Sequence, residues 1–314
     1  MINQPHIAII GCGTMGHSIA LNAAWKGLQV NLYGPDDTEI GKGLSGIRAK
    51  LGIMVSAGLL SADAMPSLLE RIVPTTSLQA AAAPASFVIE AIPENLSMKH
   101  ELYRKLESIC ARDTVFASNT SGLMPSAIAE ALVHRDRFIV LHFWNPAHLV
   151  PLVEVVRASA TSDATEQRSM ALLHDMQKKP VLVRKEIAGF IGNRLQFALL
   201  REAQYLLEQG VASAEDIDAA VTGGIGRRLP VTGPLLSADM GGLDVFEAIS
   251  NYLFSDLSQA TAAAPSLAAL VAGGKLGQKS GEGYYQWTAQ RSDQLNQQRE
   301  AELIRFLKQD GSGG

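Results

Sequence analysis

The run "IAIIGCGTMGHSIA" (residues 7–20) constrains the fold of this chain more than any other stretch, because three glycines follow a short apolar segment at a fixed spacing. Gly11, Gly13 and Gly16 form the pattern G-x-G-x-x-G where an expected strand meets an expected helix. There the first glycine permits a tight turn, the second lets backbone approach a pyrophosphate, and the third allows close helix–strand packing. Amide groups at the helix start favour phosphate. The segment therefore predicts a dinucleotide-binding turn, with a purely structural glycine turn as the alternative.

Short β-branched runs alternate with amphipathic stretches from residue 6 to about residue 183. The runs that read as strands are "HIAIIG", "LQVNLYG", "SFVIEAI", "TVFASNT", "RFIVLHFW", "LVEVVRA" and "PVLVRKE". Between them "SMKHELYRKLESICA" and "ATEQRSMALLHDMQKK" read as helices. The early strands are nearly continuous apolar runs, as expected for parallel strands covered on both faces. This order predicts an α/β fold with a Rossmann-type doubly wound sheet.

Beyond about residue 186 the pattern becomes helical throughout. "GNRLQFALLREAQYLLEQG" places Leu195, Leu199 and Leu206 on one apolar stripe that Gly210 closes. "SAEDIDAAV" offers Ser213 as a helix cap, and "QLNQQREAELIRFLKQ" reads as a final helix. A chain of 314 residues is long enough for two cores. We therefore expect a nucleotide-binding domain over residues 1–185 and an all-α C-terminal domain over residues 186–314.

Composition narrows the classes of partner. A net charge of −4 gives no reason to expect nucleic acid or an acidic membrane surface. Two cysteines are too few for a disulfide framework, so a cytoplasmic protein is expected. No uninterrupted apolar run reaches the roughly 18 residues of a membrane span. No HExxH motif or Cys/His cluster occurs, so no metal is expected.

The end of the second expected strand departs from the usual dinucleotide pattern. An acid that binds the adenosine ribose normally stands there, but "VNLYGPDD" has Gly34, and Asp36 and Asp37 follow late. These two acids fit either a helix N-cap or a ribose ligand. No arginine follows to accept a 2′-phosphate. NAD is therefore expected over NADP, with weaker discrimination than an acid at position 34 would give.

The segment "LHFWNPAHLVPLVEVV" (residues 141–156) holds a histidine and a glutamate twelve residues apart. On one continuous strand His142 and Glu154 would lie about 40 Å apart, so they meet only if the chain reverses. "NPAH" is turn-forming chemistry. Histidine suits a general base because it titrates near neutral pH, and a carboxylate on its other nitrogen fixes the tautomer. A structural histidine and an unrelated surface acid are the alternative.

Six blocks together resemble the L-3-hydroxyacyl-CoA dehydrogenase family, in the family's order from residue 7 to residue 287. They are "IIGCGTMGHSIA", "EAIPENLSMK", "FASNTSGL", "LHFWNPAHLVPLVEVV", "AGFIGNRL" and "GKLGQKSGEGYY". The resemblance implies NAD as cofactor and a hydride transfer from the 3-hydroxyl of a 3-hydroxyacyl-CoA. It also implies a homodimer formed through the helical domain.

The resemblance assigns roles to single positions. His142 matches the catalytic base, Glu154 its paired acid, Ser121 a substrate-contacting serine and Asn193 a further active-site amide. The positions expected on the cofactor side are Gly11, Gly13, Thr14, Met15, Gly16, Asp36, Glu94, Lys99, Asn145 and Lys279.

Other details are similar to a branch of the family that includes lambda-crystallin/L-gulonate 3-dehydrogenase and carnitine dehydrogenase, which act on small hydroxy acids. "SGLMPS" and "LVPLVEVV" carry this likeness. Residues 36–70, where CoA-using members present bases, hold three bases (Lys42, Arg48, Lys50) and five acids (Asp36, Asp37, Glu39, Asp63, Glu70). A stretch with more acids than bases is poorly suited to bind the negatively charged phosphates of CoA. A small non-CoA hydroxy acid or alcohol, of L-gulonate, carnitine or pyridine-alcohol type, is therefore the alternative substrate. A non-catalytic, crystallin-like protein is a remote third reading, against which the intact set of site residues speaks.

Overall fold

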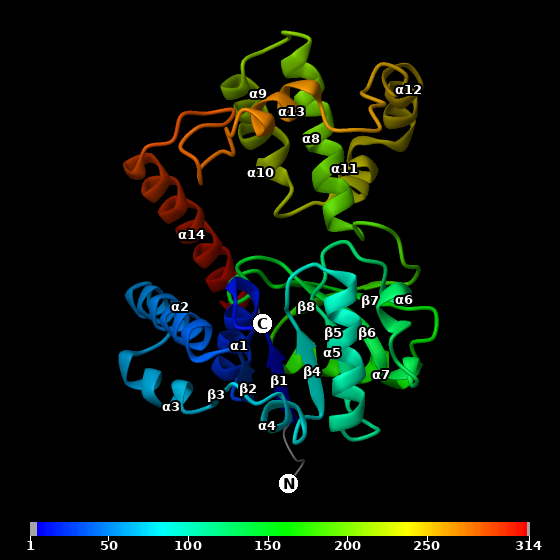
Figure 1. Ribbon diagram of the computed structural model, residues 1–314. Coiled ribbons are helices and arrows are strands. Elements are labelled where there is room, and N and C mark those ends of the chain that lie inside the picture. Colours follow the sequence, from blue (N-terminus) through cyan, green and yellow to red (C-terminus); the bar gives the residue numbers. More distant parts are fainter. Residues whose placement is uncertain (1–4, 313–314) are drawn as a thin grey trace. The chain divides into compact units, whose positions relative to one another are not determined.

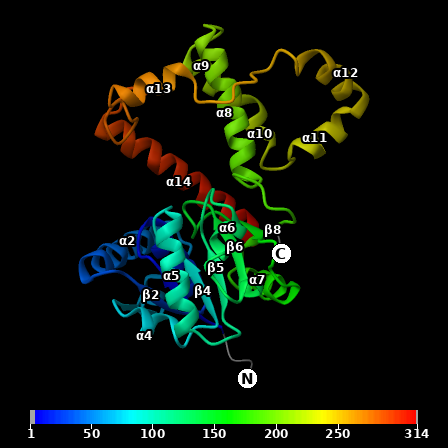
Figure 2. The ribbon, with the colours of Figure 1, turned by 45° about the vertical axis from the view of Figure 1, so that its right-hand side comes forward.

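The computed structural model describes residues 5–312 and shows a chain of two compact units (Figures 1 and 2). The first unit comprises residues 1–193 and 299–314, and the second comprises residues 194–298. The domain boundary expected at residue 186 remains a prediction. Within the described residues, no helix has both the length and the apolar character that a membrane span requires.

The first unit is built on one eight-stranded sheet. Its strands are β1 (His6–Ile10), β2 (Gln29–Tyr33), β3 (Ile72–Thr75), β4 (Phe87–Glu90), β5 (Val115–Ser118), β6 (Phe138–Phe143), β7 (Leu152–Arg157) and β8 (Lys179–Val183). They lie in the order β3-β2-β1-β4-β5-β6-β7-β8. Every neighbouring pair is parallel except β6 and β7. The predicted α/β fold is confirmed, and β3 is the strand that the sequence pattern did not indicate.

Helices cover both faces of this sheet. They are α1 (Thr14–Trp25), α2 (Asp37–Ser56), α3 (Met65–Leu69), α4 (Leu78–Ala82), α5 (Leu96–Ile109), α6 (Pro125–Ala129) and α7 (Asp163–Asp175). Because side chains alternate along a strand, Ile7 and Ile9 pack into the core under α1, α2 and α7, whereas Ala8 and Ile10 pack under α4, α5 and α6. The sheet is therefore buried on both faces, as its apolar strands predict.

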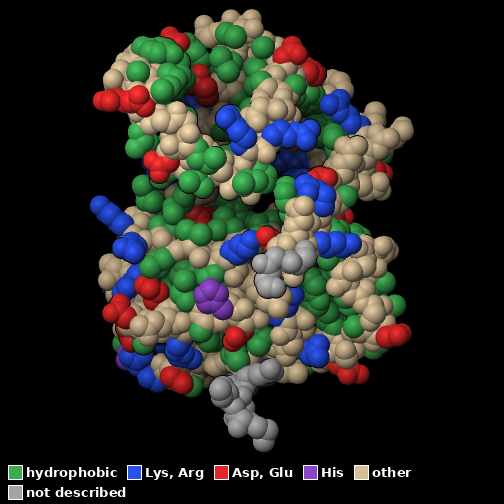
Figure 3. Space-filling model, turned by 180° about the vertical axis from the view of Figure 1, so that it is seen from behind, with side chains coloured by type: hydrophobic (Ala, Val, Ile, Leu, Met, Phe, Trp, Pro, Cys, Tyr) green, Lys and Arg blue, Asp and Glu red, His purple; other side chains and the backbone are tan. Residues whose placement is uncertain are grey.

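The second unit is helical. Its elements are most of α8 (Gly192–Glu208), α9 (Ala214–Ala220), a π-helical turn (Val221–Ile225), α10 (Gly226–Arg228), α11 (Pro234–Gly241), α12 (Leu243–Leu253), α13 (Pro265–Ala272) and the start of α14 (Ala289–Ser312). Ser213 caps α9 as predicted, its hydroxyl accepting from the Asp216 amide at 3.1 Å. Many large apolar side chains are exposed here, Leu195 and Leu199 among them. Figure 3 shows hydrophobic side chains spread over the surface of this unit.

Candidate active site

His142 and Glu154 are directly opposed partners in the antiparallel pairing of β6 and β7. Opposed residues of such a pair project to the same face of the sheet, with their Cβ atoms close together. The His142 Nδ1 and Glu154 Oε2 atoms lie 2.8 Å apart, and both side chains are buried. The chain reversal predicted for "NPAH" is confirmed, whereas the catalytic roles of the two residues remain predictions.

Buried polar groups hold the turn that joins β6 to β7. The Lys178 ammonium donates to the carbonyl oxygens of Ala147 and Val150. The Ser18 hydroxyl lies 2.9 Å from His148 Nδ1 and also accepts from the His148 amide. Burial lowers the pKa of His148 to about 3 and that of Lys178 to about 7. The turn is thus fixed to α1 and to the start of β8, and His148 is engaged as a structural partner of Ser18.

Four N–H groups surround the carboxylate of Glu154. Its Oε1 atom accepts from the amides of Ile191 and Gly192 at 2.8 and 3.0 Å. Its Oε2 atom accepts from His142 and, at 3.3 Å, from the indole of Trp144. Burial alone would raise the pKa of Glu154, but the hydrogen bonds from His142, Gly192 and Ile191, that from His142 first, outweigh burial and hold the pKa below its ordinary value. Because Glu154 is therefore a carboxylate, it engages a protonated Nδ1 and leaves His142 Nε2 to accept a proton from a substrate.

The segment that delivers the two amides has an unusual backbone. Phe190 adopts a left-handed conformation with φ of 52°, directly after Gly189 with φ of 75°. The Phe190 side chain is fully buried, and its ring centroid lies 5.5 Å from that of His142. Such a conformation is uncommon for a bulky residue and is found where the surrounding structure imposes it. In "AGFIGNRL" the predicted site residue is Asn193, but the residues before it bind the Glu154 carboxylate and pack against His142.

Ser121 and Asn193, far apart in the sequence, are brought together. The Asn193 side-chain amide donates to the Ser121 carbonyl at 3.0 Å. Glu94 holds the same loop, because it accepts from the Thr120 hydroxyl and from the amides of Ser121 and Gly122. Burial alone would raise the pKa of Glu94, but the hydrogen bond from Thr120 and the charge of Lys99 outweigh burial and hold the pKa below its ordinary value. Ser121 and Asn193, the two residues predicted on the substrate side, are therefore joined by a hydrogen bond at the loop that follows the carboxyl end of β5.

A buried charge network lies beneath this loop. The Lys99 ammonium contacts Glu90 at 2.6 Å and Glu94 at 3.4 Å. Glu90, which is fully buried, also accepts from the Ser118 hydroxyl at 2.6 Å and from Tyr103 at 3.4 Å. The structure thus places Lys99 between two carboxylates, and its predicted contact with a cofactor stays a prediction. Glu90 was not among the predicted site residues, although an acid that ends the apolar strand "FVIE" nine residues before a lysine was a usable signal.

The glycine turn fits a dinucleotide. A Cβ atom on Gly11 would lie 2.6 Å from the Ala91 carbonyl oxygen, and one on Gly16 would lie 1.7 Å from the Gly11 carbonyl oxygen. Gly13, in contrast, faces open space at the start of α1, whose first turn holds no acid. Backbone amides at this helix start can therefore bind a pyrophosphate at close range. Thr14 is exposed there and Met15 is half-buried, and their contacts with a cofactor remain predictions.

At the end of β2 the structure explains the missing acid. A Cβ atom on Gly34 would lie 2.7 Å from Ile40 Cγ1 and 2.8 Å from Cys12 Sγ, so an acidic side chain there would require Ile40 and Cys12 to move. Asp36 caps α2, its carboxylate accepting from the Glu39 amide at 2.8 Å. The capping alternative is thus observed, and a ribose contact by Asp36 remains a prediction.

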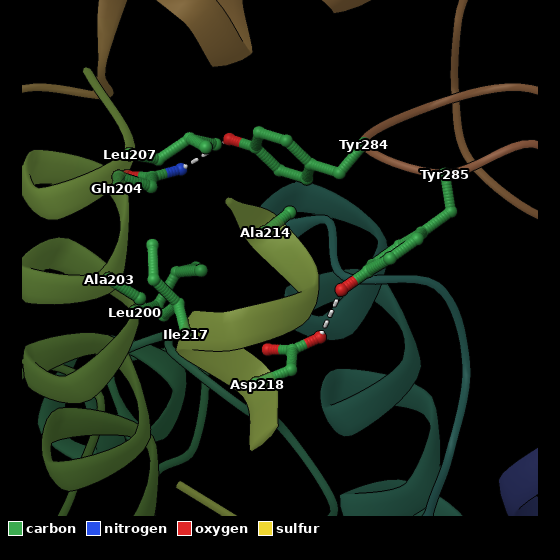
Figure 4. Close-up of a pocket in the computed structure, with 9 residues that line it drawn as sticks. All are labelled: Leu200, Ala203, Gln204, Leu207, Ala214, Ile217, Asp218, Tyr284 and Tyr285. Carbon is green, nitrogen blue, oxygen red and sulfur yellow. Dashed lines mark hydrogen bonds between the residues drawn. The ribbon is translucent and has the colours of Figure 1, made fainter. Parts of the chain in front are cut away.

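The remaining predicted positions are exposed. Asn145 lies in the turn after β6, Lys279 lies in the helical unit, and both cofactor roles stay predictions. The helical unit has a cavity of about 80 Å³ between α8, α9 and two tyrosines (Figure 4). Tyr285 donates to Asp218 there at 2.7 Å. None of the predicted site residues lines this cavity. No group of three or more His, Cys, Asp or Glu within residues 5–312 is arranged to hold a metal ion.

Comparison with known proteins identifies the family. The family description "3-hydroxyacyl-CoA dehydrogenase, NAD binding domain" matches residues 6–187, and "3-hydroxyacyl-CoA dehydrogenase, C-terminal domain" matches residues 189–287. The chain belongs to the 3-hydroxyacyl-CoA dehydrogenase family. Like its family, it is an NAD-dependent dehydrogenase that acts on a CH–OH group.

Relatives within the family act on different substrates. The chain is 35% identical to 5-formyl-3-hydroxy-2-methylpyridine 4-carboxylate 5-dehydrogenase of Mesorhizobium japonicum, over 95% of this chain and 96% of that protein. A crystal structure of the 5-dehydrogenase of that name, described as NAD+ dependent, matches with a TM-score of 0.90 at 34% identity over 98% of this chain and 99% of that one. The chain is 40% identical to 3-hydroxyadipyl-CoA dehydrogenase of Escherichia coli over 93% of its length, but spans only 61% of that protein. The structure of (S)-3-hydroxybutyryl-CoA dehydrogenase from Ralstonia eutropha matches with a TM-score of 0.77 at 33% identity, over 91% of this chain and all of that one.

Proposed function

We propose that this dehydrogenase oxidises the hydroxyl of a compact substrate without CoA, namely a small hydroxy acid or a pyridine-type alcohol. The observation that carries the proposal is the likeness, over nearly the full length of both chains, to a dehydrogenase of a pyridine carboxylate. The TM-score of 0.90 for that structure exceeds the 0.77 for the hydroxybutyryl-CoA enzyme, although the sequence identities are nearly equal. This closer likeness in fold supports a substrate without CoA.

The bases of α2 support the same proposal. Of the three basic side chains in residues 36–70, Lys42 pairs with Glu39 at 2.6 Å. Lys50 is half-buried with its ammonium 2.8 Å from His17 Nε2, and burial lowers its pKa. A lysine held in this way is a weaker ligand for phosphate than an exposed one. Among the described residues of this stretch, Arg48 is the one exposed base without an ion pair that could meet the several phosphate charges of CoA.

The proton chemistry follows from the hairpin. His142 Nε2 takes the proton of the substrate hydroxyl, and Glu154 stabilises the imidazolium that forms. The Ser121 hydroxyl and the Asn193 amide hydrogen-bond the substrate oxygen. NAD, when bound at the glycine turn, supplies the acceptor for the hydride.

A 3-hydroxyacyl-CoA is the second candidate substrate. The 40% identity to a 3-hydroxyadipyl-CoA dehydrogenase favours it, as does the family description itself. An enzyme with this hairpin but few phosphate contacts would transfer hydride from such a thioester at a raised KM.

We further propose that the protein is a homodimer formed through the helical unit. Val231, Leu235 and Met240 are between 73% and 85% exposed in the single chain. Large apolar side chains exposed close together in the sequence are typical of an interface between subunits. Burial of these side chains against a second copy would remove them from water.

The test is a comparison of kcat/KM for oxidation of a 3-hydroxyacyl-CoA, its free acid, small hydroxy acids and hydroxymethylpyridine carboxylates. The expected result is a higher kcat/KM for a compact substrate, with measurable acetoacetyl-CoA reduction at a high KM. Arg48→Ala should leave the compact substrate unaffected. A low-micromolar KM for the CoA ester alone, raised by Arg48→Ala, would instead establish the second candidate.

A further inference from the structure

Trp144 contacts the carboxylate that orients the proposed base. It follows β6 directly, and its indole N–H donates to Glu154 Oε2 at 3.3 Å. The same oxygen accepts from His142 Nδ1 at 2.8 Å. Two donors on one carboxylate oxygen share its negative charge, so His142 meets a weaker acceptor than it would without the indole.

Gly192 keeps the indole in this position. A Cβ atom at Gly192 would lie 2.3 Å from Cζ2 and 3.1 Å from Cε2 of Trp144, which means that the ring packs on the bare α-carbon. The Gly192 amide also donates to the other oxygen of Glu154. Trp144, Gly192 and Glu154 therefore form one packed unit in which a side chain at position 192 would displace the ring.

The groups that face Glu154 come from three places. Within residues 5–312 His142, on the neighbouring strand, is the ionisable side chain that hydrogen-bonds the carboxylate. Trp144 at the end of β6 and the amides of Ile191 and Gly192 at the start of α8 contribute neutral N–H donors. The neutral donors do not titrate in the working pH range. At every pH in that range they therefore share the negative charge of Glu154 that would otherwise stabilise protonated His142.

We propose that Trp144 is a positioning residue that sets the pH range of catalysis by sharing Glu154 Oε2 with His142. The proposal rests on the proposed base role of His142. It deepens that role, because it identifies a side chain that touches neither the substrate proton nor the hydride yet controls how readily the base takes up a proton.

Trp144→Phe tests this directly, because phenylalanine retains a ring and loses the N–H. In that variant Oε2 faces His142 alone, and the imidazolium is stabilised more strongly. The midpoint of the kcat/KM profile for alcohol oxidation should therefore move about half a pH unit to higher pH, with kcat on the plateau changed less than about threefold. Trp25→Phe, on α1 outside the hairpin, is the matched control and should leave the midpoint unchanged.

Gly192→Ala provides a second, independent probe. Its methyl group should displace the indole and move the midpoint in the same direction as Trp144→Phe. Phenylalanine lacks the Cζ2 atom that the methyl group would meet, so Gly192→Ala should add little in the Trp144→Phe background. Strictly additive effects of the two substitutions would contradict the packed unit.

An indole signal makes the contact observable without activity. The chain has three tryptophans, so a ¹⁵N-labelled sample should give three indole N–H resonances, of which Trp144→Phe removes one. That resonance should shift in Glu154→Gln. If it does not shift, or if the pH midpoint is unmoved in Trp144→Phe while His142→Ala is inactive, the proposal for Trp144 is wrong. A fully active His142→Ala enzyme would instead remove the base role.

Discussion

His142 and Glu154 face one another across the single antiparallel pairing of the sheet, so one hairpin supplies both the proposed base and the carboxylate that contacts it. Strand pairing, rather than the helical unit, thus determines the geometry of the couple. The hairpin that carries His142 and Glu154 is built from other elements than the glycine turn, which lies between β1 and α1.

His142→Ala should therefore lower turnover while cofactor binding persists. Loss of a general base typically reduces the rate by about 10²–10⁴-fold. Because the glycine turn is built by other elements, the dissociation constant for NAD, measured by isothermal titration calorimetry, should stay within about threefold of the wild-type value. A His142→Ala enzyme with full activity would refute this mechanism.

Glu154→Gln should impair stability as well as rate. Each carboxylate oxygen of Glu154 accepts two N–H groups, so the amide nitrogen of glutamine would face donors in either orientation. Unpaired buried donors cost about 1–3 kcal/mol, and urea unfolding should show a loss of that size. Asn145→Ala, in the exposed turn, is the comparison and should unfold close to wild type. An equally stable Glu154→Gln protein would mean that the four contacts are weaker than their geometry indicates.

Discrimination against NADP should depend on acids at the start of α2. Asp37 and Glu39 lie in its first turn, close to where the adenosine ribose lies in this fold, and would repel a 2′-phosphate. Asp37→Asn with Glu39→Gln should raise the kcat/KM of NADP relative to NAD by about 3–10-fold, in keeping with weak interactions between exposed charges. Asp63→Asn serves as the control. Gly34→Asp should not tighten NAD, because the new side chain would collide with Cys12 and Ile40.

His148 should make the protein sensitive to acid. The pKa of His148 is lowered from 6.5 to about 3 by burial, so the unfolded chain binds a proton more readily than the folded one. Above pH 6.5 His148 is neutral in both the folded and the unfolded chain, so it costs no stability. As pH falls from 6.5 toward 3, the unfolded chain takes up a proton that the folded chain does not, and the free energy of unfolding decreases by up to a few kcal/mol. His148→Asn, whose amide oxygen can replace Nδ1 as the partner of Ser18, should flatten this part of the stability curve. Parallel curves for both proteins in urea unfolding between pH 4 and pH 7 would count against it.

Light scattering should give twice the 33.5 kDa chain mass at micromolar concentration. Leu235→Glu, at a position 85% exposed in the single chain, should shift the protein toward monomer, because a charge would enter the proposed interface. Val133→Glu, at a comparably exposed apolar position in the first unit, is the matched control and should remain dimeric. A wild-type monomer would end the dimer proposal.

Much of this architecture was predictable from local patterns. Seven strands and the glycine turn follow from hydrophobic runs and spacing. The pairing of His142 with Glu154 was implied by the resemblance to the family, and the turn chemistry of "NPAH" made it possible. β3 was not predicted, since "IVPT" is a four-residue edge strand with a proline. Glu90 and Trp144 were not predicted, because their roles depend on contacts with Lys99 and Glu154 that only the folded chain brings within reach. The reason for glycine at position 34 could not be predicted from the sequence, because it depends on the position of the Cys12 sulfur next to Gly34 in the folded chain.

The hairpin between β6 and β7 also makes the couple dependent on strand register. Parallel neighbours such as β1 and β4 join residues distant in the chain, whereas His142 and Glu154 close a loop of twelve residues at small entropic cost. A slip of one residue would send one of the two side chains to the opposite face of the sheet. Lys178, which donates to the carbonyl oxygens of Ala147 and Val150 in the connecting turn, therefore helps to hold this register. A change in the length of that turn should therefore separate the proposed base from its carboxylate even if both side chains were kept.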